Sequence, residues 1–250
     1  MTQTEATVVL VHAAWADASS WNKVIPPLQR KGMEVVAVQI PLTSLSDDVA
    51  AVRRTLKRLN GPVVLVGHSY GGAVITAAAS GSPKVKALVY VAAMAPDEDE
   101  TVGQLLGHTA PHASAPALVP DDDGLLWMSA EGFAGALAHE SSAADTSLMA
   151  ATQKPIAMKC VLDPMTQPAW KEKPSWFLLA ERDRMIALET QRFMAHRAGG
   201  HLRAAQVDHT PLASAPDGVV AIIAEAVDAV AHQLFDAQRM RGGPGGASSL

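Results

Sequence analysis

A serine surrounded by glycines is the first reactive group that the sequence presents. Ser69 lies in the string GHSYG (67–71), after the apolar run 62–66 and before the helix-like stretch 71–79. A G-x-S-x-G string between a buried strand and a helix is typical of a sharp turn that holds a nucleophilic serine above the end of the strand. The glycines allow neighbouring backbone to approach where a side chain would clash. We therefore predict that Ser69 is a nucleophile.

A serine hydroxyl is a weak nucleophile at neutral pH, so it needs a general base that a carboxylate orients. His209 follows the strand-like run 202–207, and Asp183 follows the run 175–180. Both come after Ser69, in the order serine, acid, histidine that enzymes with this strand–serine–helix motif use. We predict that Ser69, Asp183 and His209 are the catalytic residues.

Other carboxylates leave the identity of the acid open. Glu181 and Asp208 flank the two chosen residues, and Asp97 comes just after the strand-like run 85–92. Asp183 is preferred because of its distance beyond the preceding strand. Asp97 remains an alternative triad acid.

Acyl transfer also needs hydrogen-bond donors for the negative charge that develops on the substrate oxygen. The backbone N–H of Tyr70, directly after Ser69 at the start of a helix, is predicted to be one donor. A second is expected from the loop after the first strand. We predict the N–H of Ala14 for this role.

The elements that must position these residues alternate along the chain. Runs that are apolar throughout predict strands buried on both faces of a parallel sheet, and amphipathic stretches predict helices. Buried strands of this kind are predicted over 7–12, 34–40, 62–66 and 85–92, further strands over 175–180 and 202–207, and helices over 19–31, 46–59, 71–79, 188–197 and 216–238. This alternation predicts an α/β fold whose mostly parallel, doubly wound sheet is flanked by helices.

The alternation stops after Pro96. Residues 97–172 contain no strand-like run, and prolines separate short helical pieces such as 125–128 and 131–139. We predict that 1–96 and 173–241 form the core and that 97–172 form a helical cap insertion over the sheet. The Gly/Ser-rich residues 242–250 predict a disordered tail.

The composition limits the possible partners. A chain of 250 residues with 48% hydrophobic and 18% charged residues is typical of a soluble globular protein, and a net charge of -5 argues against nucleic acid. The sequence shows neither a secretory signal nor an apolar run near the ~20 residues of a membrane span, so we expect a cytoplasmic protein without a membrane partner. A single cysteine, Cys160, fits a reducing compartment and is interpreted as a small filler residue. A monomer or a homodimer is equally compatible with the sequence.

Several stretches carry a family resemblance: VLVHAAWADASSWNKVIPPL, VVLVGHSYGGAVIT, LVYVAAMAPDEDE, ERDRMI and VDHTPLASAPDGV. Together they resemble the small bacterial α/β-hydrolases of the esterase and hydroxynitrile lyase-like group, which includes the plant methyl esterases. The resemblance implies the α/β-hydrolase fold, a triad of Ser69, Asp183 and His209, and Ala14 and Tyr70 as oxyanion donors. It implies no cofactor and no metal.

Two departures from that group concern the site. Ala13 stands where the relatives usually have glycine, and its side chain is expected to narrow the site slightly. The cyanohydrin-cleaving members carry a lysine directly after the catalytic histidine, and its charge stabilises departing cyanide. The corresponding residue here is Thr210, so the lyase interpretation loses its main support.

The leading hypothesis is a serine carboxylic-ester hydrolase that acts on small to medium lipophilic or aromatic esters through an acyl-enzyme on Ser69. An insertion over the serine must line the entrance, which predicts an apolar pocket. Its predicted lining residues are Ala13, Trp127, Met128, Phe133 and Met158. The alternatives are a lyase or cofactor-independent oxygenase on the same fold, and a non-catalytic small-molecule binding protein.

Overall fold

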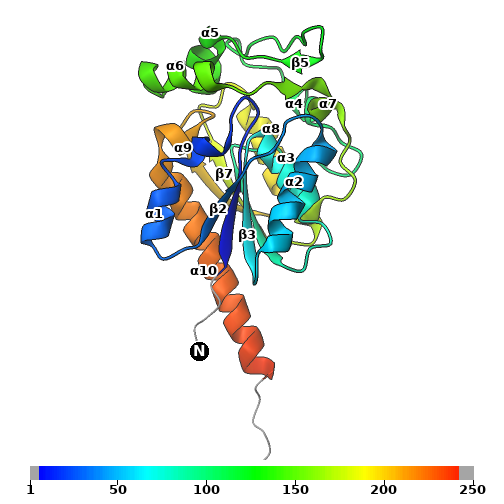
Figure 1. Cartoon of the computed structure of the whole chain (residues 1–250), viewed down its shortest axis with the longest axis vertical. Helices are drawn as coiled ribbons and strands as arrows, with labels where there is room; N and C mark the ends of the chain where they lie inside the picture. Colours follow the sequence, from blue (N-terminus) through cyan, green and yellow to red (C-terminus); the bar gives the residue numbers. More distant parts are fainter. Residues whose placement is uncertain (1–5, 242–250) are drawn as a thin grey trace, which may run out of the picture.

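A six-stranded parallel sheet forms the centre of the molecule (Figure 1). The computed structural model describes residues 6–241, so the tail predicted over 242–250 lies outside the described residues. The strand order is β2-β1-β3-β4-β7-β8. The strands are β1 Thr7–Val11, β2 Val35–Val38, β3 Val63–His68, β4 Val85–Val91, β7 Ser175–Ala180 and β8 His201–Ala205. The predicted doubly wound α/β architecture is confirmed.

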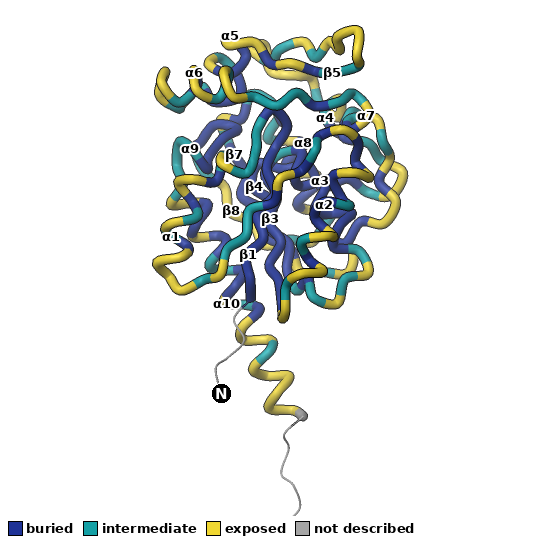
Figure 2. The backbone as a smooth tube through the Cα atoms, viewed as in Figure 1, coloured by how far each residue is buried: buried dark blue, intermediate teal, exposed yellow. Residues whose placement is uncertain are grey.

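Helices cover both faces of the sheet. One face packs against α1 Ile25–Arg30, α9 Pro211–Ser214 and α10 Pro216–Arg241, and the other against α2 Leu45–Arg58, α3 Tyr70–Ala78 and α8 Leu188–Arg197. Side chains of β1 alternate between the two layers: Val8 and Leu10 join the α10 layer, whereas Val9 and Val11 join the α3 layer. The inner strands β1, β3, β4 and β7 are buried almost throughout (Figure 2), whereas the edge strand β2 is only partly buried and the edge strand β8 is largely exposed, so the burial predicted for residues 34–40 is wrong.

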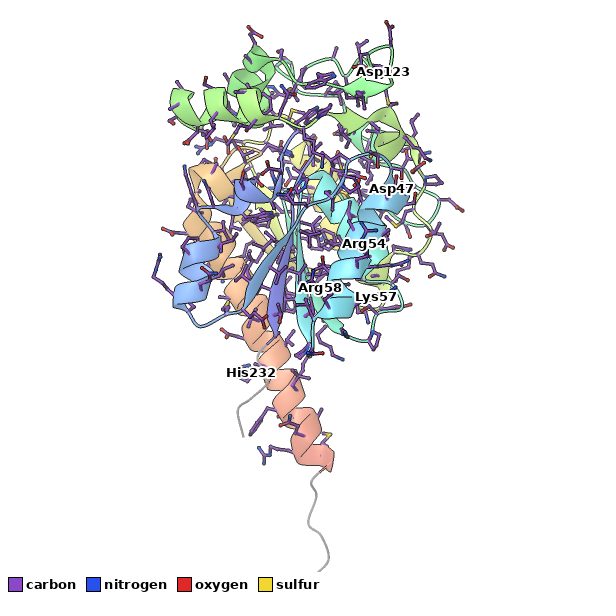
Figure 3. The ribbon with its side chains drawn as sticks, viewed as in Figure 1. Asp47, Arg54, Lys57, Arg58, Asp123 and His232 are labelled. Carbon is purple, nitrogen blue, oxygen red and sulfur yellow. The ribbon has the colours of Figure 1, made fainter. Side chains whose placement is uncertain are left out.

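Helix α2 begins with a side-chain cap. The Ser44 hydroxyl accepts a hydrogen bond from the backbone N–H of Asp47 at 3.0 Å, which satisfies one of the free donors at the helix start. Asp47 lies in the first turn, and Lys57 and Arg58 lie in the last, so these charges interact favourably with the helix dipole (Figure 3). Asp48, also in the first turn, is instead completely buried.

The single helix predicted over 19–31 is wrong. The chain forms a short 3₁₀ helix, η1 Ala18–Trp21, and then begins again with α1 at Ile25. Pro26 and Pro27 stand in the first turn of α1, where their missing N–H groups would be unbonded in any case. A helix that ran through from Ser19 would need those N–H groups as donors, so it breaks before them.

The segment 97–172, which we call the cap, lies mostly over the carboxyl ends of the strands, and its last residues return along the side of the molecule to the start of β7 (Figure 1). It contains α4 Val102–Leu106, α5 Ala130–Gly132, the π-helix η2 Phe133–Leu137, α6 Ala143–Thr152, α7 Met158–Leu162, the 3₁₀ helix η3 Ala169–Lys171, and two short strands. The helix predicted over 125–128 is wrong. Leu125–Leu126 form strand β5, which pairs antiparallel with β6 Ile156–Ala157. The N–H of Leu125 donates to the Asp121 carboxylate at 2.8 Å, which turns the chain into the strand.

Helix α10 is long and apolar enough, by length and composition, to cross a membrane. The expectation that no run approaches that length is therefore wrong on this criterion. However, its first half packs on the sheet, where Val219, Ile222 and Ile223 are buried. The helix end projects from the body on the side away from the cap (Figure 1). The absence of a membrane partner stays a prediction.

Two histidines are buried at the ends of neighbouring strands. His12 follows β1, accepts a hydrogen bond at Nε2 from the N–H of Ile40 at 3.1 Å, and donates from Nδ1 to the Ala13 carbonyl at 2.9 Å. His68 ends β3 and donates from Nε2 to the His209 carbonyl at 2.7 Å. Burial lowers the pKa of His12 to about 4 and that of His68 to about 3. Both imidazoles are therefore neutral at physiological pH.

Helix α3 approaches the strand ends so closely that its glycines leave no room for a side chain. A Cβ on Gly71 would lie 2.6 Å from the Val11 carbonyl oxygen, and one on Gly72 would lie 2.4 Å from the Met94 carbonyl oxygen. These contacts are with backbone, which cannot move aside as a flexible side chain can. The close packing that the glycine pattern predicts is confirmed.

Replacing Gly72 by alanine should destabilise the protein. The added methyl group would press on the backbone after β4, and overpacking of this kind costs about 1–3 kcal/mol. Gly218→Ala is the matched control, because a Cβ at Gly218 in helix α10 meets nothing within 4 Å. It should raise the free energy of unfolding by about 0.5–1 kcal/mol. Urea unfolding of both variants measures the difference, and equal effects would contradict the steric explanation.

The two buried histidines should make stability fall as the solution becomes acidic. Folded His12 stays neutral down to about pH 4, whereas in the unfolded chain it binds a proton near pH 6.5. Lowering the pH from 7 to 5 therefore favours the unfolded state, by about 1.4 kcal/mol per pH unit for each such histidine once the pH is well below 6.5. When the free energy of unfolding is measured by urea titration at several pH values, His12→Gln should remove the contribution of about one proton, that is about 1.4 kcal/mol per pH unit, from its pH dependence. An unchanged pH dependence in His12→Gln would contradict this explanation.

Candidate active site

Ser69 occupies the turn between β3 and α3 in a left-handed conformation, with φ 52° and ψ −122°. A non-glycine residue in such a conformation costs about 1–3 kcal/mol and persists only where surrounding contacts hold it. Those contacts are backbone hydrogen bonds. The Ser69 N–H donates to the Val91 carbonyl at 3.2 Å, and its carbonyl accepts from the N–H groups of Gly72 and Met94 at 3.0 Å each. The turn therefore fixes the direction of the serine side chain.

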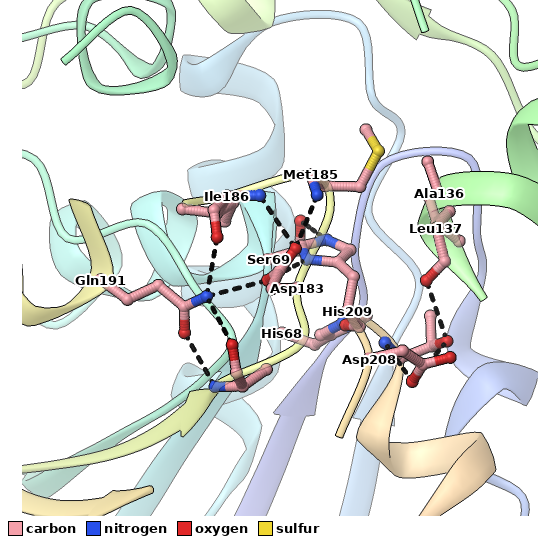
Figure 4. Close-up of polar contacts among 12 residues, drawn as sticks. His68, Ser69, Ala136, Leu137, Asp183, Met185, Ile186, Gln191, Asp208 and His209 are labelled. Atoms are coloured by element: carbon pink, nitrogen blue, oxygen red, sulfur yellow. Dashed lines mark hydrogen bonds and ion pairs between the residues drawn. The ribbon is translucent and has the colours of Figure 1, made fainter. Parts of the chain in front are cut away.

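His209 and Asp183 continue from Ser69 as an uninterrupted hydrogen-bonded chain (Figure 4). Ser69 Oγ lies 2.8 Å from His209 Nε2, and His209 Nδ1 lies 2.7 Å from Asp183 Oδ2. Because the carboxylate accepts the Nδ1 proton, Nε2 is left to accept the proton of the serine hydroxyl. The Asp183 side chain is completely buried and that of His209 is 2% exposed, so bulk water does not compete for these bonds.

The Asp183 carboxylate is held by backbone and amide donors. Its Oδ1 accepts from the N–H groups of Met185 at 2.7 Å and Ile186 at 2.9 Å, and its Oδ2 accepts from Gln191 Nε2 at 2.9 Å. Gln191 projects from α8, and its Oε1 also accepts from the N–H of Ala180 at the end of β7. Sequence reasoning missed Gln191, because a glutamine inside an amphipathic helix gives no signal until the fold places it beside the carboxylate.

The rival carboxylates lie in other interactions. Asp97 Oδ1 lies 2.5 Å from Lys171 Nζ in an ion pair at the surface. Glu181 pairs with Gln206 and lies 3.8 Å from Arg192. Neither contacts His209. Asp183 is the acid that the structure places against the imidazole.

Asp208 is buried directly before His209 but does not bond to its ring. Its carboxylate accepts from the Ser214 hydroxyl at 2.7 Å and from the N–H groups of Glu140 at 2.9 Å and Thr210 at 3.2 Å. These bonds fasten the loop that carries His209 to helix α9 and to the cap. With the bond from His68 to the His209 carbonyl, they fix the position of the imidazole.

Two residues beside Ser69 have backbone N–H groups without an acceptor in the described part of the chain. Within residues 6–241, neither Ala14 N–H nor Tyr70 N–H donates to a backbone or side-chain acceptor. Both residues line the cavity that Ser69 and His209 also line. Trp15, next to Ala14, is in the left-handed region with φ 55° and donates from Nε1 to the Leu126 carbonyl of β5 at 2.9 Å. The loop that holds Ala14 is therefore tied to the cap.

This cavity, which we call the serine pocket, is almost entirely apolar. Its walls come from the loop after β1, helix α4, the cap strands and the loop after β7. The lining residues are Ala14, Trp15, Ser69, Tyr70, Met94, Val102, Leu106, Leu118, Leu126, Ile156, Val161, Met185, Ile186 and His209. Among residues 6–241, no cluster of three or more His, Cys, Asp or Glu side chains is placed to hold a metal ion.

The predicted pocket residues do not line the serine pocket. Ala13 and Phe133 line a second cavity, on the other side of the loop that holds Ala14 and Trp15. Trp127 is 52% exposed and donates from Nε1 to Asp121, and Met128 is buried against Gly132. Met158 lines neither cavity. The pocket prediction is corrected accordingly, because the β5–β6 pairing turns Leu126 and Ile156 inward in place of their neighbours.

The chain matches known proteins over most of its length. A model of the Alpha/beta hydrolase family matches residues 8–222. An alpha/beta hydrolase of Aspergillus novofumigatus is 28% identical over 243 residues, which cover 88% of this chain and 95% of the relative. An alpha-hydroxynitrile lyase of Arabidopsis thaliana is 36% identical over 112 residues, which cover 39% of this chain and 43% of the relative.

A solved structure shares the fold. The crystal structure of a pyrethroid hydrolase from Sphingobium faniae JZ-2 superposes with a TM-score of 0.78 at 21% identity, over 91% of this chain and 99% of that one. The strand order, the turn that carries Ser69 and the family model agree with the resemblance seen in the sequence. The chain belongs to the Alpha/beta hydrolase family.

Proposed function

We propose that the protein is a serine carboxylic-ester hydrolase that works through an acyl-enzyme on Ser69. The observation that carries this proposal is the hydrogen-bonded chain from Ser69 Oγ through both nitrogens of His209 to Asp183. A hydroxyl, an imidazole and a buried carboxylate in this order make a nucleophile with its general base.

In the first half of the reaction, His209 Nε2 takes the proton of the Ser69 hydroxyl while Oγ attacks the ester carbonyl carbon. The carbonyl oxygen becomes an oxyanion, and the N–H groups of Ala14 and Tyr70 donate to it. Removing one donor of this kind typically costs about 10²–10³ in kcat. His209 then returns the proton to the alcohol oxygen, and the carbon–oxygen bond of the ester breaks.

In the second half, a water molecule takes the place of the alcohol. His209 removes its proton, the hydroxide attacks the acyl carbon, and the acid leaves as the proton returns to Ser69 Oγ. Asp183 stays ionised throughout, because its role is to hold Nδ1 protonated and to stabilise the imidazolium that forms in each half.

The serine pocket favours a lipophilic substrate. Its walls outside the reactive groups are aliphatic, sulfur-containing or aromatic side chains, and no lysine or arginine of the described part of the chain lines it. A polar substituent buried there would lose its hydration without gaining a partner. Small to medium esters with apolar acyl or aromatic groups are therefore the proposed substrates.

The same walls argue against a cyanide-releasing lyase. In the cyanohydrin-cleaving members of the group that the sequence resembles, a lysine after the catalytic histidine stabilises departing cyanide, but the residue after His209 is Thr210. Its hydroxyl is 3.1 Å from the Leu137 carbonyl, to which it donates. A lyase or a cofactor-independent oxygenase would use His209 as a base without an acyl-enzyme. The activity that remains in Ser69→Ala therefore distinguishes these enzymes from an esterase.

Hydrolysis of p-nitrophenyl esters from acetyl to octanoyl tests the proposal. The parent should release nitrophenol in a burst of about one equivalent and then turn over, because acylation precedes deacylation. Ser69→Ala should lose at least about 10³-fold in kcat/KM, with the fold intact by circular dichroism. Because the pocket is apolar, esters with short or medium acyl chains should be hydrolysed with a higher kcat/KM than a charged succinyl ester.

Three results would contradict this. If Ser69→Ala keeps most of the activity, the acyl-enzyme mechanism is wrong, and the result supports a lyase or an oxygenase instead. If no ester is hydrolysed but a small molecule binds without being consumed, the result supports a non-catalytic binding protein. If the charged ester reacts as fast as the apolar ones, the substrate class is wrong.

Asp183→Asn should lower kcat by about 10⁴-fold while KM changes little, because the amide can hold the wrong tautomer of His209 and cannot stabilise the imidazolium. Asp97→Asn is the control, since Asp97 bonds to Lys171 at the surface and should keep kcat within about twofold. Steady-state kinetics on one good ester measures both. The reverse ranking would make Asp97 the triad acid.

A further inference from the structure

Besides Asp183 and Asp208, a third carboxyl group is buried, behind the serine pocket. Asp48 in α2 is completely buried, and burial raises the pKa of its carboxyl. Tyr70 Oη donates to Oδ2 at 2.7 Å, the N–H of Leu42 donates to Oδ1 at 2.7 Å, and Cys160 Sγ lies 3.7 Å from Oδ2. Within residues 6–241, no Lys, Arg or His forms an ion pair with it. A carboxylate buried in this way depends on directional donors.

One of those donors is the hydroxyl of Tyr70, the residue whose backbone N–H is the proposed donor to the oxyanion. Tyr70 comes directly after Ser69, and its ring extends away from the turn to reach Asp48. The bond fixes the side chain of Tyr70 at its far end. It therefore limits how far the first turn of α3, and with it the Tyr70 N–H, can rotate or shift.

The other oxyanion donor is fastened by a second buried group. His12 donates from Nδ1 to the Ala13 carbonyl, which belongs to the same peptide unit as the Ala14 N–H. Its Nε2 accepts from the N–H of Ile40, so only one tautomer satisfies both bonds. The low pKa of His12, about 4, keeps that tautomer neutral. The orientation of the Ala14 N–H thus depends on Ile40.

Both fastenings end in one short segment. Ile40, Leu42 and Asp48 lie within residues 40–48, between the end of β2 and the first turn of α2. Leu42 is itself in the left-handed region with φ 62°, a conformation that surrounding bonds must hold. The cap is attached to the same segment, because Ala157 N–H donates to the Leu42 carbonyl at 2.9 Å and Lys154 Nζ donates to the Ile40 carbonyl.

We propose that residues 40–48 form an oxyanion clamp, which sets the separation and direction of the Ala14 and Tyr70 N–H groups through two positioning residues, His12 and Asp48. The inference rests on the proposed function, since it assigns these N–H groups to the oxyanion. An oxyanion hole is effective only when its donors lie about 2.7–3.1 Å from the developing charge. A small displacement of either donor therefore weakens binding of the transition state more than binding of the substrate.

The two tyrosines of the chain supply the test and its matched control. Tyr70→Phe removes the bond to Asp48 and keeps the ring and the backbone N–H. Tyr90→Phe makes the same chemical change at an equally buried site in β4, where the hydroxyl lies 2.8 Å from Thr76 Oγ1. Asp48→Asn and His12→Gln are second variants that act on the two ends of the clamp.

The measurements are kcat and KM for a p-nitrophenyl ester, thermal stability, and the inhibition constant of an aryl trifluoromethyl ketone. This ketone adds to a nucleophilic serine and places an oxyanion in the hole, so its affinity reports on the donors. Tyr70→Phe should lower kcat about tenfold, leave KM within about twofold and weaken the ketone about tenfold. Tyr90→Phe should lower the melting temperature similarly but leave kcat and the inhibition constant within about twofold.

The outcomes separate the clamp from the esterase proposal. If Tyr70→Phe and Tyr90→Phe bind the ketone equally well, the clamp is overturned. If Tyr70→Phe does not fold, the inhibition constants of Asp48→Asn and His12→Gln decide in the same way. If the parent hydrolyses no ester but binds the ketone, the esterase proposal fails and the comparison of the variants still decides on the clamp. If the parent binds no ketone, both proposals are overturned.

Discussion

The active site depends on how closely the first turn of α3 approaches the backbone that follows β1 and β4. Gly71 and Gly72 lie at distances from the Val11 and Met94 carbonyls that exclude any side chain. This contact holds Ser69 in its left-handed conformation and brings the Ser69 carbonyl to the N–H of Met94, from which it accepts a hydrogen bond. It also brings the start of α3 beside the loop after β1. Nucleophile and backbone donors are therefore neighbours because of packing between main chains.

Around that contact, buried carboxyl groups are held by hydrogen-bond donors that include no lysine or arginine of the described part of the chain. Asp183 accepts from two backbone N–H groups, the amide of Gln191 and the imidazole of His209, and Asp48 accepts from a phenol, a backbone N–H and a thiol. No lysine or arginine pairs with either carboxylate in the described part of the chain. Hydrogen bonds of this kind are directional, so each carboxylate also fixes the geometry of its donors.

The central sheet and the triad could be read from the sequence because their signals are local. Apolar runs mark β3 and β7, which are buried along their whole length and are followed by the loops that carry Ser69 and Asp183. His209 follows the exposed edge strand β8, so it was found from the order of the catalytic residues along the chain. The cap gave no comparable signal. Strands β5 and β6 have two residues each, and their pairing brings residues 125–126 to residues 156–157, far along the chain. Which of Leu126 and Trp127 faces the serine depends on that pairing, so the pocket residues could not be derived.

The burial of Cys160 and the direction of α10 together allow the protein to be attached to a support at a chosen site. Cys160 is the chain's single cysteine and is completely inside the molecule, whereas Met240, in the last turn of α10, is 87% exposed. The end of α10 points away from the cap (Figure 1). A thiol introduced at Met240 would be an accessible point for coupling the protein to a solid support. The immobilised molecules would stand with the serine pocket facing the solution.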